Sequence, residues 1–269
     1  MRRVRVGCST QRWLVAALLV LWFPCFVGAS GNWSDYRQSG RFHIRAEVRV
    51  DQTPDLQRFI ASLADHEADV ISTLQLSRND RPILINVFES RRSYLEFISK
   101  QAPEGKRRRA LFVQSEDHGS VYAYVHSDML TDLRHETTHA ILHSSLPFLP
   151  LWLDEGLAEY FEVPAQQRAS NHPHQGRVKL AARFRLTWRP SLVRLEAKRD
   201  LSGLGARDYR ESWAWLHFLL HGPGEAKDVL LQYLASIEAH TPPGPFSKHL
   251  RNVWPDPERE LTAHLRSWK

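Results

Sequence analysis

The chain has 269 residues, 42% of them apolar and 25% charged, a composition that fits an ordinary globular protein and excludes a low-complexity chain. The formal net charge is +6, but arginines within residues 1–29 supply four of these charges and leave a nearly neutral remainder. The charge therefore gives no case for nucleic-acid binding or for attraction to an anionic membrane.

Residues 1–29 have the pattern of a secretory signal peptide: a basic start, an apolar stretch over 13–27 and a small-residue cleavage site ending at Ala29. The apolar stretch is shorter than the roughly 20 residues that span a membrane. We therefore predict an exported protein (periplasmic, extracellular or cell-surface), with an uncleaved N-terminal anchor as the alternative. Both cysteines, Cys8 and Cys25, lie in this segment, so the exported chain has no disulfide and no cysteine-bound metal.

Predicted strands and helices alternate through residues 30–126. Period-two alternation and short apolar runs indicate the strands, and Thr53-Pro54 and Ser90 are typical helix starts. In order, we expect a strand over 42–50, a helix over 53–74, a strand over 83–88, a helix after Ser90 and a strand over 121–125. The basic run over 103–109 is predicted to be a solvated loop, with an anion-binding patch as the alternative.

Residues 127–269 are predicted to be mainly helical. The clearest late helices cover 209–220 and 226–237, and a last helical stretch is expected near 259–268. The expected fold class is α+β, in which a small strand–helix layer leads into a mainly helical portion. We expect 30–126 and 127–269 to form one continuous unit.

Residues 135–139 read His-Glu-Thr-Thr-His, which is the H-E-x-x-H pattern of zinc peptidases. A helix would hold His135 and His139 on one face about 6 Å apart, a spacing that suits one zinc ion. Glu136 would lie beside the open coordination position, where it could act as the general base.

A catalytic zinc needs a third protein ligand. His143 lies about 12 Å along the helix axis from His135, which is too far for one ion. The metzincin pattern fails because Leu142 and Ser145 replace its glycine and third histidine.

Acidic residues remain as candidates for the third ligand. A second helix beginning near Asp154 would put Glu155 in its first turn, facing the metal. Glu159 would share that face and accept the second ring N–H of one zinc histidine. Asp154 would cap the helix or serve the other histidine in the same way.

The pattern of His135, Glu136 and His139, followed by Trp152-Leu-Asp-Glu-Gly-Leu-Ala-Glu-Tyr160, resembles the gluzincin metallopeptidases, especially the peptidase MA-like group of bacterial exported proteins. In the aminopeptidase branch of gluzincins, a W-L-x-E-G-x-A string supplies the third ligand, and Glu155 occupies its position. The G-x-M-E-N string that binds a substrate amino terminus in that branch is missing here. The resemblance therefore implies a gluzincin fold and peptide hydrolysis with Zn²⁺, and not aminopeptidase specificity.

The resemblance implies two further roles. Tyr209 resembles the residue that stabilises the oxyanion, although a packed helix-start tyrosine is an equal alternative. Peptide substrates of such enzymes usually lie along an edge strand beside the zinc helix, and residues 120–125 are our candidate for it.

Three alternatives stay open on the sequence. The chain could be an exported zinc-binding scaffold or pseudopeptidase without hydrolytic activity. It could also be a membrane-anchored interaction domain, whose His135, His139 and Glu155 would not converge. His172 and His174 could bind a second metal, but no carboxylate is near them in sequence, so we expect them to be solvated.

Overall fold

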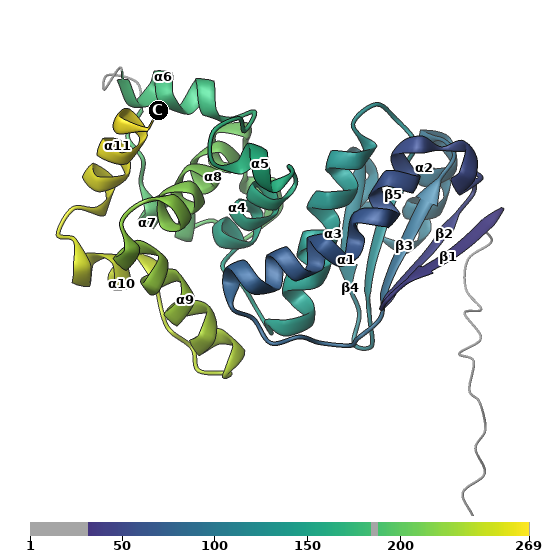
Figure 1. The fold of residues 1–269 in the computed structure, drawn as a ribbon, viewed down its shortest axis with the longest axis horizontal. Coiled ribbons are helices and arrows are strands. Elements are labelled where there is room, and N and C mark those ends of the chain that lie inside the picture. The colour runs from purple at the N-terminus through teal and green to yellow at the C-terminus, as the bar shows by residue number, and fades with distance from the viewer. Residues whose placement is uncertain (1–31, 184–187, 269) are drawn as a thin grey trace, which may run out of the picture. The chain divides into compact units, whose positions relative to one another are not determined.

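The computed structural model describes residues 32–183 and 188–268 (Figure 1). The predicted signal peptide lies outside these residues. The described residues belong to one compact unit, Gly31–Lys269, in which a mixed sheet and a helical part confirm the α+β class. No helix among the described residues is long and apolar enough to cross a membrane.

Five described strands form one sheet in the order β1-β2-β3-β5-β4. The central pairs, β2 with β3 and β3 with β5, are parallel, whereas β1 and β4 pair antiparallel at the two ends. The strands are β1 (Asp35–Ser39), β2 (Phe42–Ala46), β3 (Ile83–Phe88), β4 (Ala110–Gln114) and β5 (Gly119–Tyr124). Sequence patterns indicated β2, β3 and β5 and missed the two end strands.

The topology corrects one prediction. Residues 120–125 were expected to form the edge strand for a substrate, but β5 is hydrogen-bonded to β3 on one side and to β4 on the other. Its backbone groups are therefore already paired, and that prediction is wrong. The strand at this end of the sheet is β4, which follows the basic run at 103–109.

Two layers of helix cover the sheet. Helices α1 (Pro54–Leu74) and α3 (Met129–Ser145) pack against the face that carries Ile85 and Val121. Helix α2 (Arg91–Gln101) covers the opposite face, where Phe97 contacts Phe88 with ring centroids 5.2 Å apart. Helix α3 therefore starts from a rigid platform, because the strand before it is buried in the sheet.

The remaining chain is helical as predicted. After α3, the described helices are α4 (Leu151–Phe161), α5 (Ala165–Arg168), α6 (Gln175–Arg183), α7 (Leu192–Glu196), α8 (Ala206–His221), α9 (Gly224–Glu238), α10 (Phe246–Val253) and α11 (Pro257–Ser267). The three predicted late helices match α8, α9 and α11 to within three residues at each end. Patterns did not indicate α5, α6 and α10, which are short or polar.

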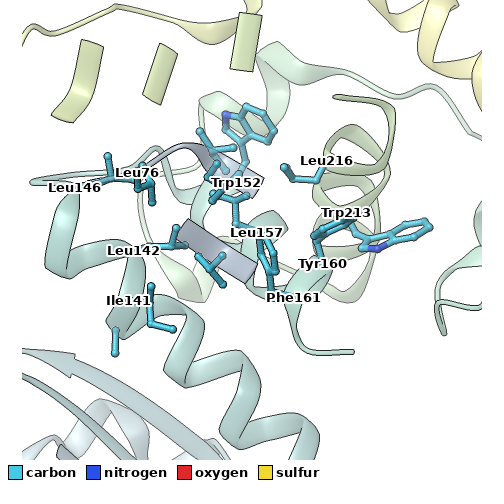
Figure 2. Close-up of a cluster of buried hydrophobic side chains, with 14 of the residues drawn as sticks. Leu76, Ile141, Leu142, Leu146, Trp152, Leu157, Tyr160, Phe161, Trp213 and Leu216 are labelled. Atoms are coloured by element: carbon cyan, nitrogen blue, oxygen red, sulfur yellow. The ribbon is translucent and has the colours of Figure 1, made fainter. Parts of the chain in front are cut away.

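Helix α4 lies between α3 and α8 in a largely apolar core (Figure 2). Trp152, Leu157 and Phe161 of α4 are buried there. Gly156 allows the close approach to α8, because a Cβ at this position would lie 3.0 Å from the Ser212 carbonyl oxygen. The glycine of the sequence string thus has a packing reason, and this packing fixes the neighbouring Glu155 against α3.

Candidate metal centre

The His-Glu-Thr-Thr-His segment lies in the middle of α3, so its side chains are set by regular helix geometry. The rings of His135 and His139 lie on one face with centroids 5.0 Å apart. The chain then reverses over residues 146–150 and begins α4, where the backbone N–H groups of Leu153 and Asp154 bond to the Pro150 carbonyl. Glu155 in this first turn is thereby brought back to the two histidines.

The three predicted ligands converge. Glu155 Oε2 lies 3.6 Å from His135 Nε2, and Glu155 Oε1 lies 3.9 Å from His139 Nε2. One ligand atom from each of the three residues lies within 4.8 Å of the others. Bonds of about 2.1 Å in tetrahedral geometry put ligand atoms roughly 3.4 Å apart. A single ion would therefore need only a small contraction of this group.

Each histidine also contacts a carboxylate on its far side. His139 Nδ1 lies 2.8 Å from Asp154 Oδ1, and His135 Nδ1 lies 3.0 Å from Glu162 Oε2. Because an ionised carboxylate only accepts hydrogen bonds, each Nδ1 carries a proton, which leaves the Nε2 on the side of Glu155 as the ring nitrogen that can bind a metal. The same tautomer orients histidines at metal sites.

Glu159 has a different neighbour from the one we predicted. Its Oε2 lies 2.7 Å from His174 Nε2, and its backbone carbonyl accepts a hydrogen bond from His172 Nε2 at 2.8 Å. Glu162, which follows the last turn of α4, contacts His135 in its place. Glu162 could have been found from the sequence, because it is seven residues after Glu155 and so recurs on the same helix face.

His172 and His174 are not solvated, which corrects that prediction. His172 is buried and stacks on Trp213 with ring centroids 4.5 Å apart. Burial lowers its pKa to about 4, so it is neutral. The carboxylate that contacts His174 is that of Glu159, which is distant in the sequence. Both histidines contact Glu159 of α4, and among the described residues they belong to no group of side chains that could hold a metal ion.

His143 is not part of the three-residue group, as helix geometry predicted. Its Nε2 lies 2.8 Å from Asp154 Oδ2, so one carboxylate holds both His139 and His143. These three residues also bring ligand atoms within 4.8 Å of one another. In that arrangement, however, Asp154 already has both oxygens engaged, whereas Glu155 does not.

The buried carboxylate of Glu155 has one oxygen that makes no hydrogen bond with the described residues. Glu155 is 3% exposed, and its Oε2 has no hydrogen-bond partner among the described residues. An unpartnered charged oxygen inside a protein is costly. A cation between Glu155 and the two histidines would remove that cost, so the donor set fits a bound metal ion.

The electrostatics of the group also favour a cation. Burial lowers the pKa of His135, but the neighbouring carboxylates of Glu155 and Glu162 outweigh it and raise the net pKa well above its ordinary value. Burial opposes the charge of His139 in the same way, and Asp154 again reverses the direction and raises its pKa. Both rings therefore attract positive charge, which a proton or a metal ion can supply.

Glu136 is buried next to His135, and its carboxylate accepts no hydrogen bond from any described residue. Its charge acts on three neighbours, since it raises the pKa of Tyr94, Arg108 and His135. Its oxygens are consequently available to accept a proton from water.

Arg108 belongs to the site although we predicted a solvated loop for the run at 103–109. It follows the short 3-10 helix Pro103–Arg107, which is fixed by a hydrogen bond from the Tyr94 hydroxyl to the Gly105 carbonyl at 3.4 Å. On its other side, Arg109 pairs with Asp128 at 2.6 Å. Arg108 is half-buried between these anchors.

The guanidinium of Arg108 interacts electrostatically with residues of the candidate metal centre. Burial opposes its charge, but Tyr209, Glu155 and Glu136 outweigh burial and raise the pKa of Arg108. Burial and Glu155 raise the pKa of Tyr209, and the positive charge of Arg108 opposes this effect. Tyr209, at the start of α8, thus lies near the predicted ligands, as expected, but with an arginine that sequence reasoning missed.

The chain matches no protein-family model and no curated protein. Its interpretation therefore depends on the geometry described above.

Proposed function

We propose that this chain is an exported zinc metallopeptidase of the gluzincin type, with His135, His139 and Glu155 as metal ligands. The observation that carries the proposal is the buried carboxylate of Glu155, whose Oε2 has no hydrogen-bond partner among the described residues and whose two oxygens face the Nε2 atoms of His135 and His139. Two histidines and one carboxylate form the ligand set of several catalytic zinc sites. Carboxylates behind both histidines support zinc further, because they fix the tautomer that binds metal.

Zinc held by these residues would acidify a water molecule and polarise a carbonyl group. Glu136 takes a proton from the attacking water as the new C–O bond forms. It then gives that proton to the amine nitrogen as the C–N bond breaks. The freedom of its carboxylate from other hydrogen bonds supports this role.

Arg108 and Tyr209 act on the other side of the carbonyl. As the tetrahedral intermediate forms, negative charge develops on the carbonyl oxygen, and fixed donors stabilise it. A guanidinium and a phenol held together near Glu155 are suitable donors. Arg108 also balances the negative charge of Glu136 and Glu155 before substrate binds.

Strand β4 is the proposed binding edge for an extended peptide. It pairs only with β5 among the described strands, so its outer edge can add a further strand. Phe112 of β4 stacks over His139, with ring centroids 6.2 Å apart. A peptide on this edge would therefore pass close to the ligand face of α3.

The test is a measurement of bound zinc and peptide hydrolysis for the wild type, Glu136→Gln and a control, Glu116→Gln, in an exposed loop. We expect stoichiometric zinc in all three proteins, with hydrolysis of a peptide mixture lost only in Glu136→Gln and in wild type treated with chelator. Hydrolysis that survives Glu136→Gln would exclude Glu136 as the base. Bound zinc without hydrolysis in the wild type would favour the zinc-binding scaffold instead.

A further inference from the structure

A groove of about 900 Å³ lies beside the start of α4, and its lining residues other than Asp154 have no part in the proposed chemistry. One wall comes from residues 148–151, which connect α3 to α4. The others come from α7 with the residues after it and from the segment between α9 and α10 (Figure 1). Asp154 lines the groove as well, and its carboxylate holds His139. The groove and the metal centre thus share one residue.

The groove exposes apolar side chains. Phe148 is 42% exposed and Val193 46% exposed, and both belong to its lining together with Leu149 and Tyr233. Large apolar side chains gathered in one concave surface are typical of binding sites, whereas isolated ones are not.

The wall that residues 242–245 form is held in place by contacts within the chain. Pro242, Pro243 and Pro245 restrict the backbone there. Tyr233 donates a hydrogen bond from its hydroxyl to the Gly244 carbonyl at 2.9 Å, and His249 Nε2 donates one to the Pro243 carbonyl at 2.7 Å. A preformed wall lowers the entropy lost on binding.

The charge of the groove is unbalanced. Its two carboxylates are engaged, Glu196 by the backbone N–H and hydroxyl of Ser247 and Asp154 by two histidines. In contrast, Arg199 and Lys248 are exposed lining residues without an ion-pair partner among the described residues. Cations therefore remain available to a ligand, and carboxylates do not.

We infer that this groove binds an extended polypeptide segment in which acidic and apolar side chains alternate, and that the segment belongs to the protein substrate. Apolar side chains would contact Phe148 and Val193 while carboxylates pair with Arg199 and Lys248. That the bound segment is part of a substrate rests on the proposed peptidase function. The binding itself does not, because it needs neither metal nor Glu136.

The test uses the full chain carrying Glu136→Gln, so that no peptide is cut, in buffer with chelator. Fluorescence anisotropy would measure the Kd of a short labelled peptide of alternating glutamate and leucine. Peptides of lysine with leucine and of glutamate with serine would serve as comparisons. The groove variants are Arg199→Glu with Lys248→Glu, and separately Phe148→Ser. The control is Arg91→Glu, an exposed cation on α2 without an ion-pair partner among the described residues.

We expect the glutamate–leucine peptide to bind, and the charge-reversed variant to raise its Kd about tenfold or more, while Arg91→Glu leaves it unchanged. Binding should weaken as salt rises from about 0.01 M to about 1 M, which shortens the screening length to about 3 Å. Phe148→Ser should weaken the glutamate–leucine peptide more than the glutamate–serine peptide.

Absence of binding, or equal Kd values for the parent and the charge-reversed variant, would overturn the inference. Equal affinity for the lysine–leucine peptide would also overturn it. Circular dichroism of each variant checks folding, and the Phe148→Ser arm tests the groove without changing charge. Binding without any peptidase activity of the wild type would reject the proposed function and leave the groove as a docking site.

Discussion

Two groups of histidines in this molecule have pKa values that are shifted in opposite directions. The metal-centre histidines, His135 and His139, have carboxylates at both ring nitrogens. The C-terminal histidine cluster, His217, His221 and His264, is enclosed by aromatic rings, and His217 lies 3.9 Å from the Trp268 ring centroid. No carboxylate is among the causes of the pKa shifts of these three histidines.

Burial alone would favour neutral rings in both groups. It prevails in the C-terminal cluster, where burial, with the neighbouring rings, lowers the pKa of His217 to about 3 and that of His264 to about 4. Carboxylates reverse the outcome at the metal centre and raise the pKa of His135 and His139. A cluster of histidines by itself is therefore no sign of a metal site, and the carboxylates around it decide.

The largest expected effect comes from a matched pair of substitutions. His139→Gln removes one of the three proposed zinc ligands, so zinc affinity should fall by more than the roughly 100-fold that loss of an outer partner costs. His217→Gln should leave zinc affinity unchanged. Competition with a coloured chelator measures both values. Comparable losses in the two variants would break the distinction between the two groups.

The next effect concerns Arg108, whose neighbour Arg107 is exposed and serves as its control. Arg108→Ala removes a cation from the place where we propose that negative charge develops, so kcat for a peptide should fall about 100-fold, with zinc still bound. Arg107→Ala should retain the wild-type kcat. A raised KM with unchanged kcat would make Arg108 a residue for substrate binding instead.

A smaller effect on zinc binding is expected from the carboxylates that contact the proposed histidine ligands. Glu162→Gln and Asp154→Asn replace the carboxylates that contact His135 and His139 with neutral amides. Each substitution should weaken zinc binding about 10-fold to 100-fold. Glu159→Gln tests our sequence prediction directly, because the Glu159 carboxylate contacts His174. We expect it to weaken zinc less than Glu162→Gln does, as isothermal titration would measure. The reverse order would restore the role that the sequence predicted for Glu159.

Helix periodicity explains how much of the site was predictable. His135, His139 and Glu155 are set by positions within one helix and by the first turn of the next, and all three converge. Asp154 contacts His139 as one of its two predicted roles requires. Where two residues on one helix face compete for a partner, as Glu159 and Glu162 do, a shift of one turn decides, and sequence spacing does not resolve it.

Residues brought in from distant segments were harder to predict. Arg108 precedes a strand that sequence patterns missed, and it reaches Tyr209 about one hundred positions later only because β4 closes that end of the sheet. His172 and His174 were predicted to be solvated because no carboxylate is near them in sequence, but in the structure both contact Glu159. Such contacts depend on tertiary packing, which periodicity does not contain.

The smallest expected effect tests the C-terminal histidine cluster through pH. His217 Nε2 donates to the Ala169 carbonyl, so its Nδ1 accepts from His264 Nε2 at 2.9 Å. A second proton on His217 would lose that acceptor and place charge among aromatic rings. Its folded-state pKa of about 3 lies below the unfolded value of 6.5, so the unfolded chain binds more protons between these values.

The stabilisation due to neutral His217 is therefore complete above about pH 6.5 and is lost as pH falls towards 3. Between pH 7 and pH 5 this one group should lower the free energy of unfolding by on the order of 2 kcal/mol. Urea unfolding at both pH values should show a smaller decrease for His217→Gln than for the wild type. His43→Gln, at an exposed position on β2, should retain the full decrease. An unchanged decrease in His217→Gln would mean that the aromatic enclosure does not hold this ring neutral, and the contrast with the metal-centre histidines would then depend on their carboxylates alone.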